Sequence, residues 1–202
     1  MNFVSFKNSL RDFPVFSIAD IRATYGGFDH RRLSEWQKKG YIQKIVKGYY
    51  IFSEVDIDEN ILSVIANKIY KPSYISFETA MSHYRLIPES IYMITSASTR
   101  RTYLFQSPLA RFSYRTIKPA LFFGYAILSD GIKMAFMEKA ILDYFYINPS
   151  VRTEDDFSSL RINKEEILSR LKKKRLINYV KRFNQKRLSK RVEQFLSWLN
   201  YL

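Results

Sequence analysis

The chain has 202 residues, of which 47% are hydrophobic and 16% aromatic, which is enough apolar material for a packed core, so disorder is not the default expectation. It contains no cysteine, so disulfides, thiolate zinc sites and cysteine nucleophiles are excluded. Lys and Arg number 33 against 19 Asp and Glu, a formal net charge of +14 with a pI near 9.8. This excess favours a polyanionic partner through counterion release.

The positive charge lies mainly at the two ends of the chain. Residues 1–55 carry a net +4 and residues 148–202 a net +8, whereas residues 56–147 carry only +2. The first ten residues are interrupted by Lys7 and Asn8 and do not read as a signal peptide. The longest apolar stretch, 120–128, is too short to cross a bilayer. We therefore expect a cytoplasmic protein without a membrane partner.

The first predicted helix, residues 2–13, ends at Pro14. Its apolar stripe repeats at spacings of three and four and consists of Phe3, Phe6, Leu10 and Phe13. A second helix is predicted to begin at Ser17, because Asp20 three residues later completes a capping-box pattern. Gly26-Gly27 is expected to end it, since glycine adopts positive φ at low cost.

A third helix is predicted from a cap at Asp29 to Lys39, with Leu33 and Trp36 on its buried side. The side chains that project from its outward face are Arg31, Ser34, Glu35 and Lys38, and those that flank this face are His30, Arg32, Gln37 and Lys39. Such a helix can enter a major groove and offer a guanidinium to guanine. The alternative is a solvated helix face, which explains most charged faces.

A basic hairpin follows this helix. Residues 41–45 and 49–52 are β-rich and join through Val46-Lys47-Gly48, which places Lys44 at a strand end and Lys47 at the tip. Helix, glycine turn, helix and basic hairpin is the order of a winged helix-turn-helix. We therefore predict a DNA-binding domain over residues 1–55. A winged helix that binds protein remains the alternative.

The predicted contacts divide into two kinds. Arg31 and Ser34 are expected to meet base edges, which carry sequence information. The cations expected at phosphates, which position the module without reading sequence, are Arg32, Lys38, Lys39, Lys44 and Lys47.

Residues 56–202 are predicted to form a second, α+β domain, so the whole chain belongs to the α+β class. Helices are expected at 57–69, 77–84 and 134–147, and strands at 74–75, 91–95, 102–105, 112–117 and 121–128. A turn is expected at 129–131.

Residues 148–202 read as the basic helical part of that domain. Residues 148–160 are predicted to be a loop, and Asn163 with Glu166 to open a helix whose apolar side is Ile167, Leu168 and Leu171, with Lys172–Arg175 near its end. The final helix has an apolar stripe formed by Leu188, Val192, Phe195, Leu196 and Leu199. Two readings compete for its cations: a second nucleic-acid contact, or a solvated helical cap.

Catalytic patterns are missing from the sequence. The two histidines, His30 and His83, are far apart, and neither a phosphate-binding glycine loop nor a nucleophile elbow occurs. Glu138 and Asp143 are five positions apart on one helix, so they do not share a face, and we expect them to be solvated or structurally paired. His83 is expected to be a packing histidine. These patterns predict no enzyme, no metal and no cofactor; the alternative is a nucleic-acid enzyme that recruits Glu138 and Asp143 to a metal.

Three segments carry a resemblance to a known family. They are K-G-Y-Y-I-F ending the hairpin, Y-I-S-F-E-T-A-M-S-H-Y-R-L-I-P-E from Tyr74 to Glu89, and M-A-F-M-E-K-A-I-L-D-Y from Met134 to Tyr144. Their succession resembles the AbiEi family of antitoxins from type IV toxin-antitoxin (abortive-infection) systems, over about residues 16–147. At the end of the second-domain helix, where that family usually has H-G-L, this chain has His83-Tyr84-Arg85-Leu86.

The resemblance implies a winged helix that binds double-stranded DNA in the promoter of its own operon and represses it. Helix-turn-helix proteins often bind inverted repeats. The resemblance also implies a second domain required for antitoxicity against a cognate AbiEii-type nucleotidyltransferase toxin, without a stable complex between the two. A protein-interaction module that grips a toxin or another partner, with the winged helix as scaffold, is the competing hypothesis.

Overall fold

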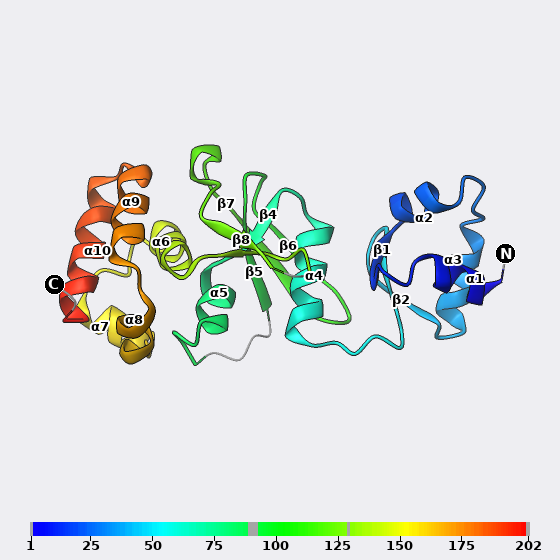
Figure 1. The fold of residues 1–202 in the computed structure, drawn as a ribbon, viewed down its shortest axis with the longest axis horizontal. Coiled ribbons are helices and arrows are strands. Elements are labelled where there is room, and N and C mark those ends of the chain that lie inside the picture. Colours follow the sequence, from blue (N-terminus) through cyan, green and yellow to red (C-terminus); the bar gives the residue numbers. More distant parts are fainter. Residues whose placement is uncertain (1, 89–92, 129, 201–202) are drawn as a thin grey trace.

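The computed structural model describes residues 2–88, 93–128 and 130–200. It is a mixed α+β structure, as the sequence predicts. Figure 1 shows an elongated molecule with a small N-terminal unit at one end, a sheet with helices in the middle, and a group of helices at the other end. Within the described ranges, none of the helices has the length and apolar character needed to cross a membrane.

The N-terminal unit combines three helices with a small antiparallel sheet. Its elements are α1 (Phe3–Ser9), β1 (Val15–Ser17), α2 (Ile18–Thr24), α3 (Arg31–Lys38), β2 (Ile42–Val46) and β3 (Tyr49–Phe52). The strand order is β1-β3-β2, and Phe16 pairs with Tyr50. β1 is not predicted by the sequence, because three residues before a capping box give too short an alternation to recognise.

One face of this small sheet packs on the three helices. Phe6 of α1 is fully buried, with its ring centroid 4.5 Å from Trp36 of α3 and 5.6 Å from Phe16 of β1. Edge-to-face and tilted pairs of this kind add to the burial of apolar area. The predicted Ser17–Asp20 capping box is present at the start of α2.

The other face of the small sheet packs on the middle of the molecule. Val15, Ile45 and Ile51 belong to the large core cluster of the second part of the chain. A β-bulge between Lys44 and Val46 shifts the register of β2, and bulges of this kind reorient side chains. Asp20 also binds Lys68 of α4, Oδ2 to Nζ, at 2.9 Å.

The middle part is built on one six-stranded mixed sheet. Its elements are α4 (Glu59–Ile69), β4 (Ser73–Ile75), α5 (Phe77–His83), β5 (Met93–Ser98), β6 (Tyr103–Gln106), β7 (Arg111–Thr116), the 3₁₀ turn η1 (Pro119–Leu121), β8 (Tyr125–Ile127), β9 (Lys133–Ala135) and α6 (Met137–Ile147). The strand order is β6-β7-β5-β4-β9-β8. The β5–β7 and β4–β9 pairs are parallel, and the others are antiparallel.

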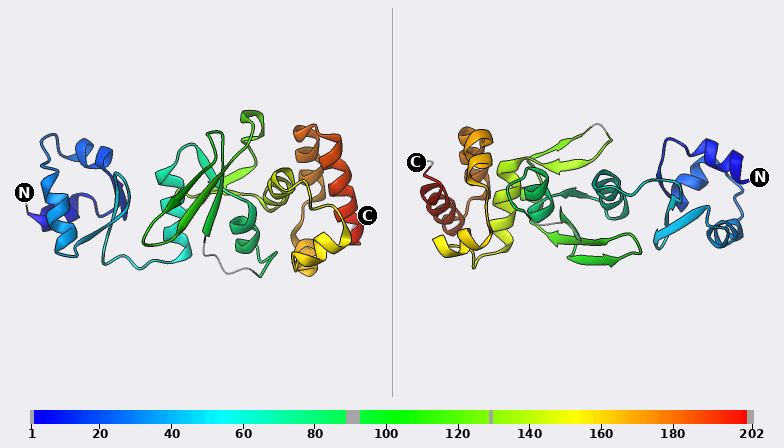
Figure 2. Two further views of the ribbon diagram at one scale, coloured as in Figure 1. Left: turned by 180° about the vertical axis from the view of Figure 1, so that it is seen from behind. Right: turned by 90° about the horizontal axis from the view of Figure 1, so that it is seen from below.

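Helices cover both faces of this sheet. Tyr114 of β7 donates its hydroxyl to the Ala66 carbonyl of α4 at 2.7 Å, whereas Thr95 of β5 bonds Thr79 of α5. Tyr114 pairs with Ser96, the residue after Thr95, and successive side chains point to opposite faces. α4 and α5 therefore lie on opposite sides, as Figure 2 also shows.

The C-terminal part is a group of helices docked on α6. They are α7 (Glu154–Ser159), α8 (Lys164–Arg170), α9 (Lys173–Phe183) and α10 (Lys186–Trp198). Phe195 of α10 lies between Phe145 of α6, at 5.1 Å between ring centroids, and Phe157 of α7, at 5.3 Å. The predicted apolar stripe of the last helix is buried as expected.

Several local predictions for the N-terminal unit are wrong. α1 ends at Ser9, so Phe13 lies beyond it and is 49% exposed, with the Lys68 ammonium 5.2 Å from its ring. Gly26 and Gly27 do not adopt positive φ; α2 ends instead on Tyr25 in extended backbone. Gly48, in the hairpin turn, does adopt positive φ, at 85°.

Corrections also apply to the second part. Met134 lies in β9, because the predicted helix at 134–147 begins only at Met137, and the strand expected over 121–128 shortens to β8 after η1. The predicted loop at 148–160 contains α7, opened by a Thr153–Asp156 capping box. The run Lys172–Arg175 opens α9 instead of ending α8, and Leu168 is 40% exposed. Predictions for residues 91, 92 and 129 lie outside the described residues.

Candidate nucleic-acid interface

The helix α3 is held by its buried side. Leu33 and Trp36 are each 3% exposed and pack on α1 and the small sheet, which turns the rest of the helix outward. Its start differs from the prediction, because His30 and not Asp29 is the N-cap and makes no side-chain cap bond. Asp29 still serves the helix start, since its Oδ1 accepts the Arg31 amide at 3.0 Å.

Two of the predicted DNA contacts on α3 are paired with carboxylates at the surface. The Arg31 side chain is 92% exposed, and its Nε lies 3.2 Å from Asp29 Oδ1. Lys39 Nζ lies 2.7 Å from Glu35 Oε1, one turn apart on the helix. Hydrogen bonds from Arg31 lower the pKa of Asp29, and the bond between Glu35 and Lys39 lowers the pKa of Glu35 and raises that of Lys39.

The other predicted contacts of α3 differ in exposure. Ser34 and Lys38 are exposed, whereas Arg32 is half-buried and has interactions within the protein. His30 is exposed, and its ring meets Phe28 edge-on at 5.8 Å between centroids. The outward face of α3 therefore combines donors held by carboxylates with donors facing solvent.

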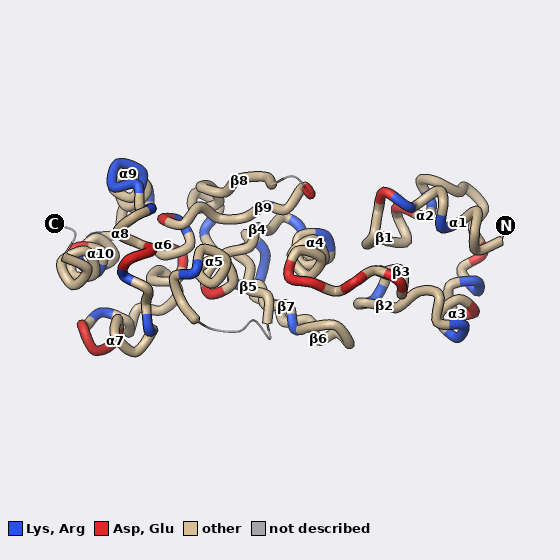
Figure 3. Tube along the Cα trace, turned by 60° about the horizontal axis from the view of Figure 1, so that its bottom comes forward, with Lys and Arg blue, Asp and Glu red and all other residues tan. Residues whose placement is uncertain are grey.

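The β2–β3 hairpin adjoins α3. The Tyr41 amide donates to the Trp36 carbonyl at 2.9 Å, which ties the end of the helix to the start of the hairpin. Lys44 and Lys47 are both exposed, the first on β2 and the second in the turn. The turn is anchored, because the Gly48 carbonyl accepts the Ile18 amide at 3.0 Å. Figure 3 shows the cations of α3 and β2 within the N-terminal unit.

The structure adds features that the sequence did not single out. Arg22 is exposed on α2 and is a further cation of the N-terminal unit; helical phasing from the buried Ile21 could have found it. The bond between Asp20 and Lys68 joins the start of α2 to α4. No sequence signal marks a pair separated by 48 positions in this way.

The carboxylates on α6 are structurally paired, which is one of the two expected outcomes. Glu138 is 1% exposed; it accepts the Lys172 amide at 2.8 Å and an Arg175 guanidinium bond at 3.4 Å. Asp143 is fully buried and pairs with Lys139. Burial raises the pKa of Asp143 and lowers that of Lys139, and each effect exceeds the opposing attraction within the pair.

His83 is not the packing histidine that the sequence suggests. It is exposed at the end of α5, with its ring edge-on to Tyr84 at 5.2 Å between centroids. A cavity of about 400 Å³ beside it is lined by residues of α4, α5 and the sheet, including Asp58, Glu59 and Thr79. Within residues 2–88, 93–128 and 130–200, no three histidine or carboxylate side chains group closely enough to hold a metal ion.

Comparison with models of known protein families and with curated proteins finds no match to this chain. Function must therefore be argued from the residues themselves and from the resemblance of the three sequence segments.

Proposed function

We propose that residues 1–55 form a winged helix-turn-helix that binds double-stranded DNA, with α3 as the reading helix and the β2–β3 hairpin as the wing. The observation that carries this proposal is the outward face of α3, where Arg31, Ser34 and Lys38 are exposed beside the basic hairpin. The chain order α1-β1-α2-α3-β2-β3 and the small antiparallel sheet support it.

The dimensions of α3 suit this role. Eight residues rising about 1.5 Å each make a rod of about 12 Å, and the major groove, about 12 Å wide, accepts one helix. Buried Leu33 and Trp36 fix the rotation of the helix about its axis. A reading helix needs this rigidity, because base contacts demand a defined register.

Arg31 and Ser34 are assigned to base edges. The Arg31–Asp29 pair is at the surface, where such pairs contribute little to stability. A guanine edge, which accepts two hydrogen bonds from a guanidinium, can therefore replace Asp29 at small cost. Asp29 meanwhile holds the guanidinium near the helix start.

The remaining cations are assigned to phosphates, and His30 stands beside them at the helix start. They are Arg32, Lys38, Lys39, Lys44 and Lys47. Lys38, Lys44 and Lys47 are exposed on α3, on β2 and at the hairpin turn. Phosphate contacts of this kind set position and affinity and make binding strongly dependent on salt.

For the whole chain we propose an antitoxin that represses its own operon and counters a nucleotidyltransferase toxin encoded nearby. The resemblance to the AbiEi family supports this role, and the α3 surface supplies a means of repression. In cells, expression of the chain should restore growth when the neighbouring gene product is toxic. Persistent growth arrest would contradict the antitoxin role and leave the DNA-binding proposal intact.

The DNA-binding proposal is tested by titrating the full chain against the duplex upstream of its own gene and against a scrambled duplex of equal length, each at two salt concentrations. We expect tight binding to the upstream duplex alone, weakening steeply with salt. Equal, weak binding to both duplexes would contradict sequence reading by α3.

A further inference from the structure

The helices α9 and α10 carry an unusual share of the charge of the chain. Residues 172–199 contain ten Lys and Arg but a single carboxylate, Glu193. Figure 3 shows α9 as a strongly basic segment, while α7, on the opposite side of the same end of the molecule, begins with acidic residues. Some of these cations serve the fold: Arg175 bonds Glu138, and Arg191 donates to the Phe145 and Asn148 carbonyls. Arg182 lies 3.6 Å from the centroid of the Phe123 ring, and Lys173 also has interactions within the protein.

Three of the remaining cations surround one open groove at the turn between α9 and α10. Lys181, Lys186 and Lys190 line a cavity of about 580 Å³, with Glu193 farther along α10. Asn184 adopts the left-handed conformation, with φ of 49°, and makes the two-residue turn that brings the helices together. All three lysines are exposed, and no carboxylate lies within 4 Å of their ammonium groups among the described residues.

This charge pattern does not stabilise the helices. Lys186 and Lys190 are one turn apart on α10, where like charges repel, and the first turn of α10 is basic although the helix dipole favours anions there. By contrast, the first turns of α7 and α8 are acidic, and Arg170 of α8 pairs with Glu166. Cations that repel one another and oppose the helix dipole, without a stabilising ion pair, are typical of a binding surface.

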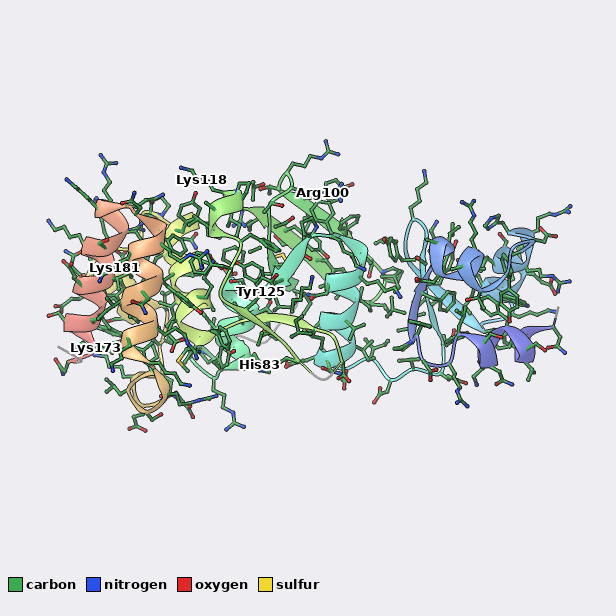
Figure 4. The ribbon with its side chains drawn as sticks, turned by 45° about the horizontal axis from the view of Figure 1, so that its top comes forward. His83, Arg100, Lys118, Tyr125, Lys173 and Lys181 are labelled. Atoms are coloured by element: carbon green, nitrogen blue, oxygen red, sulfur yellow. The ribbon has the colours of Figure 1, made fainter. Side chains whose placement is uncertain are left out.

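The surface lies at the end of the molecule remote from α3. Figure 4 shows Lys173 and Lys181 on α9 at that end, and Lys118, also exposed, at the adjoining corner of the sheet. Over the described part of α9 and α10, no exposed aromatic side chain is available for stacking on unpaired bases. Charge without stacking groups fits the phosphates of a duplex better than a single strand.

We propose that the α9–α10 hairpin, with Lys181, Lys186 and Lys190 at its centre, is a second nucleic-acid surface, which binds the phosphate backbone of a duplex without reading its sequence. Regularly spaced phosphates are complementary to three lysines on one groove that lack carboxylate partners. This surface is separate from the α3 surface and holds whether or not α3 reads a specific site.

The test uses the full chain in which Arg31→Ala, Lys44→Gln and Lys47→Gln weaken the N-terminal surface. Binding of a random 30-base-pair DNA duplex is measured by fluorescence anisotropy at several salt concentrations. Adding Lys181→Gln, Lys186→Gln and Lys190→Gln is expected to weaken binding about tenfold or more and to lower the salt slope by about two to three units. Adding Glu193→Gln to the starting variant instead should tighten binding.

The matched control changes net charge equally on α7–α8 and its flanks, with Arg152→Gln, Arg161→Gln and Arg170→Gln. We expect less than a twofold effect, because this region is rich in carboxylates. Equal losses for the two triple variants, or no loss for either, would overturn the proposal. The same measurement on an RNA duplex of the same sequence identifies the source of the phosphates. If the three lysine changes weaken binding of the RNA duplex more than binding of the DNA duplex, an RNA duplex is the supported occupant. Loss confined to anionic phosphatidylglycerol vesicles would overturn it.

Discussion

Two of the ion pairs in this protein have completely different surroundings. Lys139 and Asp143 on α6 are fully buried, and Asp143 also accepts the hydroxyls of Tyr74 and Ser76, each at 2.8 Å. Arg31 and Asp29 at the start of α3 form a pair in which the arginine side chain is 92% exposed. The first pair joins α6 to β4, and the second lies at the molecular surface.

The difference separates charges that serve the fold from charges available to a ligand. Water has no access to Lys139, whose ammonium lies 5.0 Å from the rings of Phe123 and Phe183 and bonds Tyr74 at 2.7 Å. Losing one partner there leaves a buried charge uncompensated. At Arg31, water or a ligand replaces the partner easily. Four experiments test this difference.

The largest effect is expected at the buried pair. Asp143→Ala should lower the free energy of unfolding by about 3–5 kcal/mol, because it removes the carboxylate that neutralises the buried Lys139 ammonium and accepts the Tyr74 hydroxyl. Urea denaturation measures the change. The double variant Lys139→Met/Asp143→Leu should regain much of the loss, and a double variant as unstable as the single one would contradict this account.

Packing around Lys139 is tested at Gly124, which has φ of 75°. A Cβ there would lie 3.0 Å from Lys139 Cγ and 3.1 Å from Tyr179 Cε2. Gly124→Ala should therefore destabilise by about 1–3 kcal/mol, from backbone strain and crowding together. Gly131→Ala is the matched control, since Gly131 has φ of 74° in open space. Equal losses of melting temperature for the two variants would show that the Lys139 contact is unimportant.

The exposed pair should behave in the opposite way. Arg31→Ala should leave the free energy of unfolding within about 0.5 kcal/mol of the parent. It should reduce discrimination between upstream and scrambled duplexes by about 1–3 kcal/mol. Lys47→Ala, the control, should weaken binding to both duplexes equally and lower the salt slope of binding by about one unit. Unchanged discrimination in Arg31→Ala would remove the base-reading role.

The smallest effect concerns Asp20, between the two parts of the molecule. Burial raises the pKa of Asp20, but hydrogen bonds from Lys68 and Ser17 outweigh it, and the net pKa lies below its ordinary 3.8. Its contribution to stability is therefore present above pH 3.8 and lost as the pH falls through the lower folded value. Asp20→Asn should lower the free energy of unfolding by about 1 kcal/mol at pH 7 and by less near pH 3. Urea denaturation at the two pH values measures the change. A constant cost across this range would contradict the linkage.

The elements that the sequence predicts best are those with strong local signals. The Ser17–Asp20 capping box and the apolar stripe of α10 depend only on neighbouring residues, and both are present. For the α6 carboxylates, Glu138 and Asp143, the sequence leaves open solvation or structural pairing, and the structure shows pairing. Helical and strand periodicity likewise predicts that the side chains of Arg31, Ser34, Lys38 and Lys44 are exposed, as they are; Lys47 is exposed in the hairpin turn.

The sequence-based predictions fail for elements that form through contacts with residues distant in the sequence. β1 exists because Val15–Ser17 pairs with β3, and β9 because Lys133–Ala135 lies between β4 and β8. α7 lies in a polar segment held by one buried residue, Phe157, which packs on Phe145 and Phe195. The partner of Asp20 likewise comes from α4. Local patterns carry no information about such contacts.

Contact between DNA and the exposed cations of the N-terminal unit can be measured by lysine acetylation footprinting of the full chain, with and without the upstream duplex. Lys38, Lys44 and Lys47 are all exposed. The acetylation rate of each lysine therefore shows whether bound DNA covers it. We expect their acetylation rates to fall when the duplex is bound, while that of Lys71, exposed in the bend before β4, is unchanged. Unchanged rates at all three lysines, with the duplex demonstrably bound, would contradict this contact.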